Sequence, residues 1–347
     1  MMEKPDVIIA GAGYAGLAAA IQLGARALVI DQHDIGAVQR SACAMPVAVV
    51  ERFGAAESII QRYDAAFFHD ERGTHRFDLK SPYCIINHRM FCRLLWEQTD
   101  ARFLKVRVRG FNGKNIDTGD RQFSAPLYID ATGWTGMLSV PARTAKDPSL
   151  RLTTAIEADI PGRGGGLHIY YVPKIVPRGY GWVFPADSEL RVGVGSYDRS
   201  IDLKGSLSAF LQFLGLEGKP ARGGLIPWFR GEAVVDNVFA AGDSAGHCLP
   251  LTAEGIRMAL GFGDAAGRFT RSVVDGSMSL RAAADGYRSV CQLHQRSFEV
   301  MRKSQRLIGV VPDVGVHYLA RLLTDSRVKP YFLHTYFSLG APPGRAV

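Results

Sequence analysis

A glycine-rich turn close to the N-terminus constrains this chain more than any other feature. The apolar run at residues 7–10 predicts a buried strand, which leads directly into Gly-Ala-Gly-Tyr-Ala-Gly at 11–16. In such a pattern Gly11 permits the tight turn, Gly13 lets a pyrophosphate approach the backbone, and Gly16 lets the next helix pack closely on the sheet. The helix N-terminus offers free amides to the phosphates. We therefore expect a dinucleotide site that includes Ala12 and Ala15.

The residues after this turn support the same interpretation. Residues 17–23 predict a helix that ends at Gly24, and 27–30 predict a second buried strand that ends on Asp31. An acidic side chain at this position would accept hydrogen bonds from an adenosine ribose and repel a 2′-phosphate. The alternative is an α/β unit whose glycine turn holds no ligand.

Composition and charge narrow the class of protein. With 347 residues, 47% of them hydrophobic and 21% charged, the chain is long enough for two lobes and has no disordered character. The net charge of +8 is compatible with an anionic partner, such as a phosphorylated substrate or an acidic membrane surface, or simply with an arginine-rich enzyme. Because the basic residues form no dense block, we expect no nucleic-acid partner.

Cysteine and histidine spacing predicts neither disulfides nor a metal site. The five cysteines are odd in number and form no Cys-x-x-Cys pair, and the nine histidines form no His-x-x-x-His pair. The N-terminus enters the first strand without a signal peptide, and no run of about eighteen apolar residues predicts a membrane span. We expect a cytoplasmic protein, with peripheral contact to a membrane left open.

The pattern along the chain predicts two interleaved lobes. The predicted strands are 65–69, 74–79, 84–87, 105–109, 127–130, 151–160, 166–172, 181–184, 190–196 and 238–241. Helices are predicted at 88–99 and 207–216, and the C-terminal third looks helical. This third is expected to cover the second lobe, with a basic membrane-facing surface as the alternative.

Three motifs in order resemble a known branch of flavoproteins. They are the N-terminal glycine turn, Asp-Ala-Thr-Gly at 130–133 and Phe-Ala-Ala-Gly-Asp at 239–243. This order resembles the glutathione-reductase-type FAD proteins of the p-hydroxybenzoate hydroxylase branch. The resemblance implies that Gly242 and Asp243 contact the flavin's ribityl or phosphate region. It also implies that the amides of Gly255 and Ile256, at the start of a helix, face the isoalloxazine and stabilise its anionic reduced form.

A second, more specific match lies in the second lobe. The segment Tyr-Gly-Trp-Val-Phe-Pro at 180–185, followed by Gly-Val-Gly at 193–195, is similar to the signature of geranylgeranyl reductases. In that family the Tyr and Trp line an apolar cavity at the flavin. The resemblance implies catalytic roles for Tyr180 and Trp182 and a substrate-lining role for four further residues: Phe184, Pro185, Gly193 and Gly195. An ordinary strand with an inward aromatic face would have the same alternation.

The resemblance also assigns residues around the flavin. Cys43 stands where geranylgeranyl reductases carry a cysteine beside the flavin, although this chain has fewer glycines around it, and a plain buried cysteine is the alternative. A thiol at that position would lend a proton to the reacting carbon. Arg40 and Arg89 are assigned to the cofactor, Arg89 near its phosphate and ribityl chain, and Val106 to the adenine.

The resemblance implies a fold, domain boundaries and a reaction. The expected fold is α/β (α+β), with a Rossmann-type FAD-binding lobe, an interleaved antiparallel-sheet substrate lobe and a helical C-terminal segment. The FAD-binding domain is assigned to 1–64, 84–150 and 231–275, the substrate domain to 65–83 and 151–230, and the helical segment to 276–347.

The implied reaction is hydride transfer from reduced FAD to a carbon-carbon double bond of an isoprenoid lipid or diphosphate, with NADPH, NADH or ferredoxin as the external donor. The alternatives are a flavin monooxygenase or halogenase acting on a hydrophobic or aromatic substrate, a cyclase or isomerase with a non-redox flavin, and a flavin-binding interaction protein. The Trp-x-Trp-x-Ile-Pro pattern of halogenases is absent.

Overall fold

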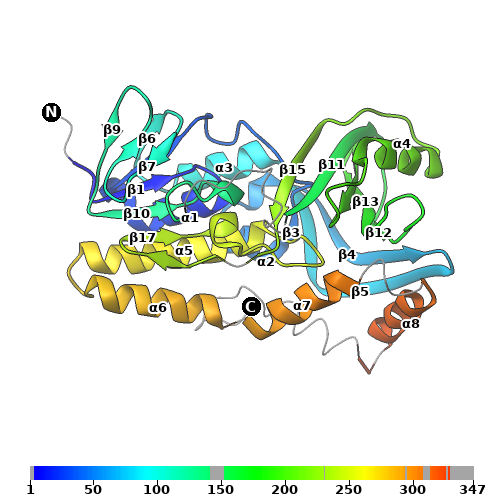
Figure 1. Ribbon diagram of the computed structural model, residues 1–347. Helices are drawn as coiled ribbons and strands as arrows, with labels where there is room; N and C mark the ends of the chain where they lie inside the picture. Colours follow the sequence, from blue (N-terminus) through cyan, green and yellow to red (C-terminus); the bar gives the residue numbers. More distant parts are fainter. Residues whose placement is uncertain are drawn as a thin grey trace.

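Two lobes lie side by side, each built around its own sheet (Figure 1). The computed structural model describes residues 4–140, 152–229, 231–293, 295–307, 313–325 and 327–328. The helical segment predicted to reach residue 347 therefore extends beyond the described residues. The predicted mixed α/β fold with a Rossmann-type lobe and a second, sheet-based lobe is confirmed.

The first lobe is a mainly parallel six-stranded sheet. Its strands, in spatial order, are β16 (Val234–Val235), β17 (Val238–Ala240), β10 (Leu127–Asp130), β1 (Val7–Ala10), β2 (Ala27–Asp31) and β6 (Arg102–Lys105). All neighbours pair in parallel except β16 and β17. β1 and β10 are completely buried, as expected for strands covered on both faces. Their carboxyl ends meet at one edge, where ligands of such sheets bind.

Helices cover this sheet and bring distant segments together. They are α1 (Tyr14–Leu23), α5 (Ile256–Val274) and α6 (Leu280–Gln292), and α3 (His88–Trp96) packs on α1. The short helix α2 (Val47–Arg52) contacts strands of the second lobe instead. α5 lies against α1 because it carries glycines at the contact: a Cβ on Gly263 would lie 2.2 Å from the Ala15 carbonyl oxygen, and one on Gly267 2.8 Å from that of Ala19. This close contact brings residues 242–256 to the glycine turn.

The second lobe is an eight-stranded sheet. Its strands, in spatial order, are β15 (Arg222–Pro227), β11 (Leu152–Pro161), β14 (Glu189–Ser196), β13 (Gly179–Ala186), β12 (Leu167–Tyr170), β4 (Ile59–Asp70), β5 (Gly73–Ile86) and β3 (Ala44–Pro46). The predicted antiparallel sheet is correct except at β12 and β4, which pair in parallel because their connection crosses over from the first lobe. Strand β3 joins this sheet although it lies inside the range 1–64 assigned to the first domain.

Helices cover both faces of the second sheet. α4 (Leu203–Phe213) packs on one face, where its Phe210 and Leu207 join a core with Val192 and Val194. On the other side, α7 (Gln295–Leu307) and α8 (Asp313–Thr324) run below the sheet in Figure 1, and α8 contacts β4 and β5. The predicted cover over the second lobe therefore consists of α7 and α8. α6 instead packs on α5 and β16 of the first lobe.

Several predicted boundaries were wrong for identifiable reasons. The three short strands predicted between 65 and 87 are two long strands, β4 and β5, joined by a tight hairpin and bent at two irregularities in their register. The strand predicted at 105–109 lies at Arg102–Lys105, because residues 102–105 are the ones that pair with β2. A small third sheet, formed by β7 (Gly110–Phe111), β8 (Ile116–Asp117) and β9 (Gln122–Phe123), had not been predicted.

Candidate flavin and substrate site

One cavity of about 1870 Å³ connects the two lobes. It begins at the carboxyl ends of β1 and β2, follows the face of the second sheet along β13, and ends beneath α7 and α8. Most of its walls are apolar; acidic residues such as Asp31 and Asp243 line its first end, and Arg296, Ser297 and Ser304 add polar groups at its far end. A cavity of this kind is suited to a long ligand with one polar and one apolar end.

The glycine turn has the geometry of a phosphate-binding loop. Gly11 has φ +104°, and a Cβ there would lie 2.2 Å from the Ala131 carbonyl oxygen. A Cβ on Gly16 would lie 1.9 Å from the carbonyl oxygen of Gly11. Gly13 differs from both, because a Cβ there would meet nothing within 4 Å. Gly11 and Gly16 are thus required by the protein's own packing, whereas Gly13 leaves space in the cavity that a pyrophosphate fits.

The end of β2 brings the predicted ribose-binding carboxylate to this space. Asp31 lines the cavity, and its two carboxylate oxygens accept hydrogen bonds of 2.8 Å from the amides of Ala12 and His33. Val106 also lines the cavity, and its amide donates to the Asp31 carbonyl at 2.7 Å. The residues assigned to the ribose and the adenine therefore lie next to each other.

The segment after β17 closes the other side of the cofactor space. Gly242 has φ +69° and begins a short 3-10 helix at Gly242–Ala245, and Asp243 lines the cavity. Burial raises the pKa of Asp243 to about 6. Among the described residues, no side chain or amide donates a hydrogen bond to this carboxylate. An acceptor without a protein partner at this depth suits a ligand hydroxyl or phosphate contact.

The N-terminus of α5 points its first amides into the cavity. Gly255 is the N-cap of α5 and Ile256 its first residue, both line the cavity, and no side chain caps this end. Leu251 and Ala253, in the loop before the helix, have φ of +70° and +53°, which is rare for residues with a side chain. The free amides and the helix dipole favour negative charge at this position.

Strand β13 supplies the aromatic wall predicted from the signature. Tyr180, Trp182 and Phe184 alternate with buried residues and line the cavity, with ring centroids 6.2 and 6.5 Å apart in order. The tyrosine hydroxyl donates to the Thr252 carbonyl at 3.0 Å, which ties this wall to the loop before α5. Pro185 is buried and does not line the cavity, and its carbonyl accepts from the Tyr63 hydroxyl.

The two glycines of the signature lie opposite these rings on β14. Gly193 pairs with Trp182 in the sheet, and a Cβ there would lie 2.1 Å from the indole, so this glycine makes room for the ring. It lies beneath the indole rather than on the cavity surface. Gly195 pairs with Tyr180 and does line the cavity. The spacing in the signature therefore reflects the register between the two strands.

A buried ion pair orients the tryptophan, and sequence reasoning missed it. Glu157 on β11 is 3% exposed, accepts from the Trp182 indole nitrogen at 2.8 Å, and accepts from Arg222 Nε at 2.7 Å. Burial raises the pKa of Glu157, and the neighbouring Arg222 guanidinium opposes that shift. The available signal was one acidic residue inside the otherwise apolar and small Leu-Thr-Thr-Ala-Ile-Glu-Ala pattern of the strand.

The thiol of Cys43 faces protein groups rather than the cavity. Cys43 has φ +61° and is fully buried; its Sγ lies 3.2 Å from the Ser41 carbonyl and 3.5 Å from the Tyr14 hydroxyl. Burial raises the pKa of this thiol to about 11. Ala42 and Ala44 line the cavity, but among the described residues Cys43 does not. The catalytic role expected for it stays a prediction.

A tyrosine–histidine pair beside Cys43 was also missed. The hydroxyl of Tyr14, the fourth residue of the glycine turn, lies 2.6 Å from His88 Nδ1, and both side chains line the cavity. Burial lowers the pKa of His88 to about 4, so this imidazole is neutral at pH 7. The pair is a hydrogen-bonded network that carries exchangeable protons and reaches the cavity surface.

The two assigned arginines differ in position. Arg40 is exposed and lines the cavity. Arg89 is exposed as well, but it is the second residue of α3 and does not line the cavity, whereas its neighbour His88 does. The roles of both arginines stay predictions.

The far end of the cavity is roofed by the C-terminal helices. α7 contributes Val300, Met301 and Leu307 to the lining, and α8 contributes Val316 and Leu319. No helix in the described part of the chain is long and apolar enough to cross a membrane.

Comparison with curated proteins finds isoprenoid reductases. The chain is 26% identical over 305 residues to a digeranylgeranylglycerophospholipid reductase of Methanococcus vannielii, covering 76% of each chain. It is 30% identical over 150 residues to a geranylgeranyl diphosphate reductase of Rhodobacter capsulatus, covering 40% of this chain and 36% of the relative. No protein-family model matches the chain.

Solved structures share the fold across nearly the whole chain. A geranylgeranyl bacteriochlorophyll reductase-like protein from Thermoplasma acidophilum superposes with a TM-score of 0.81 at 18% identity, covering 93% of this chain and 92% of its own. A flavin-dependent brominase superposes with a TM-score of 0.77 at 16% identity, covering 97% and 94%.

These comparisons confirm two predictions. The chain resembles the geranylgeranyl reductases, and its class as a flavin-dependent oxidoreductase is supported by reductase-named relatives and by the flavoprotein fold. The fold is shared with a flavin-dependent brominase and with a probable FAD-dependent monooxygenase as well, so it does not separate these chemistries.

Proposed function

We propose that this protein uses reduced FAD to saturate carbon-carbon double bonds in an isoprenoid chain of the geranylgeranyl type. The observation that carries the proposal is the continuous cavity, which joins a dinucleotide-type polar end to an aromatic and aliphatic end. Curated relatives named for reduction of geranylgeranyl lipids and diphosphates support it. The positive charge of the chain suits an anionic head group at the cavity mouth.

The residues of the first lobe fit FAD. Gly13 leaves room for the pyrophosphate, Asp31 would accept from the ribose, and Asp243 would accept from the ribityl or phosphate region. The amides at Gly255 and Ile256 would stabilise negative charge on the ring system. When bound and reduced, FAD supplies a hydride to one alkene carbon, a proton adds to the other carbon, and the cofactor is left oxidised.

The chain's own groups would bind the alkene, exclude water and supply the proton. Tyr180, Trp182 and Phe184 offer a flat apolar surface on which a polyprenyl chain can lie, and α7 and α8 close the cavity above it. The Tyr14 hydroxyl, hydrogen-bonded to neutral His88, is a proton donor within reach of the cavity. Cys43 is a second candidate donor through its contact with Tyr14.

The test is anaerobic turnover of FAD-loaded, dithionite-reduced protein with geranylgeranyl diphosphate and with a digeranylgeranyl phospholipid. We expect mass spectrometry to detect a gain of two hydrogens for each bond reduced. Unchanged mass for both substrates, together with rapid oxygen consumption and an oxygenated or halogenated product from an aromatic substrate in a parallel aerobic assay, would favour the monooxygenase or halogenase alternative. An isomeric product of unchanged mass would favour a cyclase or isomerase.

The external electron donor is tested in the same assay. NADPH, NADH and reduced ferredoxin are offered in place of dithionite, and the rate of flavin bleaching is followed anaerobically. We expect one donor to bleach the flavin much faster than the other two.

A further inference from the structure

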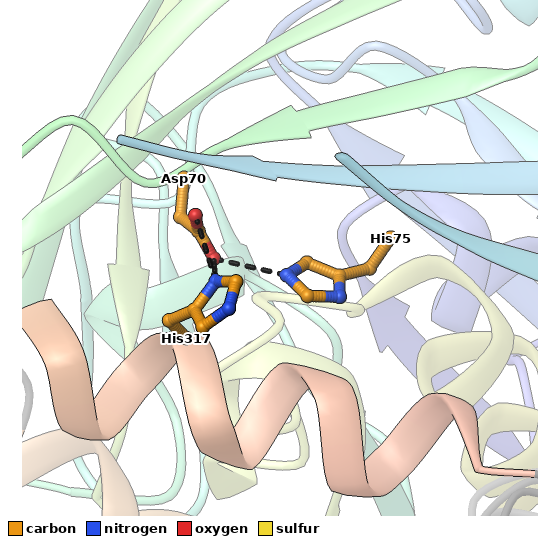
Figure 2. Close-up of side chains that lie close together, drawn as sticks. All are labelled: Asp70, His75 and His317. Atoms are coloured by element: carbon orange, nitrogen blue, oxygen red, sulfur yellow. Dashed lines mark hydrogen bonds and ion pairs between the residues drawn. The ribbon is translucent and has the colours of Figure 1, made fainter. Parts of the chain in front are cut away.

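Three side chains from three separate elements converge where α8 crosses the β4–β5 hairpin. They are Asp70 at the end of β4, His75 near the start of β5 and His317 on α8 (Figure 2). His75 Nε2 lies 3.1 Å from Asp70 Oδ2, and His317 Nδ1 lies 3.0 Å from the same oxygen. The side chains of Asp70, His75 and His317 are 3%, 10% and 18% exposed. The cluster is thus partly buried.

The spacing of the three atoms suits a metal ion. Two nitrogens and one oxygen, one from each residue, all lie within 4.8 Å of one another. Ligands about 2.05 Å from a tetrahedral Zn²⁺ ion are about 3.3 Å apart along each edge. The two oxygen–nitrogen separations, 3.1 and 3.0 Å, are close to that edge. Small shifts of side chains would therefore admit an ion between them.

The surroundings of Asp70 hold its carboxylate in place for this role. Its Oδ1 accepts hydrogen bonds from the amides of Arg72, at 2.8 Å, and Gly73, at 3.0 Å, in the hairpin turn. Oδ2 is directed toward both imidazoles, and His317 Nδ1 also lies 3.2 Å from Oδ1, as Figure 2 shows. A ligating carboxylate whose other oxygen is hydrogen-bonded is the usual arrangement in metal sites.

We propose that Asp70, His75 and His317 bind one divalent transition-metal ion, with Zn²⁺ as the preferred ion. Two neutral imidazoles and one carboxylate form a nitrogen and oxygen donor set that Zn²⁺ accepts, and water would fill the fourth position. The set lies at the rim of the cavity but outside its lining. The proposal does not depend on the proposed reductase activity.

The ion would hold α8 in place over the apolar end of the cavity. α8 contributes Val316 and Leu319 to the cavity lining, one residue before and two residues after His317. A bond from His317 to an ion held by the β4–β5 hairpin would keep this part of α8 against the second sheet. Metal binding would therefore order the helix that covers the apolar end of the cavity.

The first test is calorimetric titration of chelator-treated, tag-free, FAD-loaded protein with ZnCl₂, with metal content measured after gel filtration. We expect one equivalent of Zn²⁺ per chain. His317→Gln and His75→Gln should each weaken binding by at least about 100-fold, the upper limit of the 10–100-fold typical of losing an outer-shell partner. His168→Gln is the matched control, because His168 pairs with His69 at 2.9 Å outside the cluster; it should bind as the unchanged chain does.

The second test follows hydrogen exchange of α8 amides with and without Zn²⁺. At about 100 times the dissociation constant, exchange through local opening should slow by up to about 100-fold in the unchanged chain and in His168→Gln, but not in His317→Gln. Flavin content and circular dichroism verify that each variant is folded. The proposal would be overturned if Zn²⁺ did not bind stoichiometrically, or if the two cluster variants bound it as well as the unchanged chain does. The three side chains would then only hydrogen-bond to one another.

Discussion

The two ends of the cavity are built in different ways. At the cofactor end, short segments such as 7–16, 27–31 and 242–256 place backbone amides and glycines around the ligand space. At the substrate end, side chains come from β13 and from α7 and α8, and they are oriented by residues of still other strands, such as Glu157 on β11. The first end depends on local backbone geometry, the second on the register and packing of distant elements.

This difference explains why the cofactor end is easier to predict from the sequence than the substrate end. Where the backbone must adopt a positive φ or pass close to a carbonyl oxygen, only glycine fits well. The sequence therefore shows a glycine at that one position. An aromatic wall made of side chains can be built from many sequences, and what orients it lies elsewhere in the chain. The predictions below test this comparison.

The largest effect is expected at the glycine turn. Gly11→Ala puts a Cβ 2.2 Å from the Ala131 carbonyl oxygen at φ +104°, so the free energy of unfolding should fall by about 3 kcal/mol or more. Gly13→Ala meets no atom within 4 Å and should change that free energy by less than about 0.5 kcal/mol. Urea unfolding of the apoprotein measures both.

The same pair of variants separates packing from ligand binding. Gly13→Ala should still lose at least about tenfold in FAD affinity, because its methyl group occupies the space proposed for the pyrophosphate. The flavin absorbance retained after gel filtration is the readout. Full retention of flavin by Gly13→Ala would contradict the view that backbone geometry forms the cofactor end of the cavity.

The next effect concerns His88, a side-chain feature at the cofactor end. Its pKa is lowered to about 4 by burial, against about 6.5 in the unfolded chain. Stability from this group is therefore fully present above pH 6.5 and is lost as the pH falls toward 4. At pH 5 the loss relative to pH 7.5 should be about 2 kcal/mol.

His88→Gln removes this titration and provides the comparison. Urea unfolding of the unchanged chain and the variant at pH 7.5 and pH 5 isolates the contribution, since all other titrating groups are shared. The variant should lose about 2 kcal/mol less than the unchanged chain between the two pH values. Equal losses of unfolding free energy in the two proteins would mean that burial does not oppose protonation of His88.

A third prediction tests the substrate end through the strand register. Gly193→Ala places a Cβ 2.1 Å from the Trp182 indole, so the ring must move and alkene reduction should fall at least about tenfold, while FAD is retained. Gly195→Ala, whose nearest contacts are 3.6 Å, should cost less than about threefold. Mass-spectrometric turnover and flavin content are measured for both. Equal losses of turnover in the two variants would mean that displacement of the Trp182 indole is not what lowers the activity.

The smallest effect is expected at Cys43, between the two ends. Because its thiol faces Tyr14 and Ser41 and its pKa is about 11, Cys43→Ala should change the turnover rate by less than about threefold. A loss of tenfold or more with normal flavin content would support the catalytic role that the family resemblance implies. Single-turnover rates of flavin oxidation by substrate give the measurement.

Particular residues mark the limit of prediction from sequence. The motif glycines, Asp31 and the alternation along β13 were predicted, because each reflects a local backbone or strand requirement. The partners of Trp182 and Tyr14 were not, since Glu157 and His88 reach them only through the fold. The cluster of Asp70, His75 and His317 could not be predicted from spacing, because 247 residues separate its aspartate from the histidine of α8.

The sequence by itself determined that the chain forms a Rossmann-type lobe, carries a signature similar to that of geranylgeranyl reductases, and places aromatic residues on one face of a strand. These features follow from steric rules and periodicities that act within a few residues. Only the tertiary structure decided that Gly193 underlies Trp182, that Cys43 turns toward Tyr14, and that α7 and α8, but not α6, cover the cavity. Such contacts join elements far apart in the chain, and their free energy depends on how whole elements pack together.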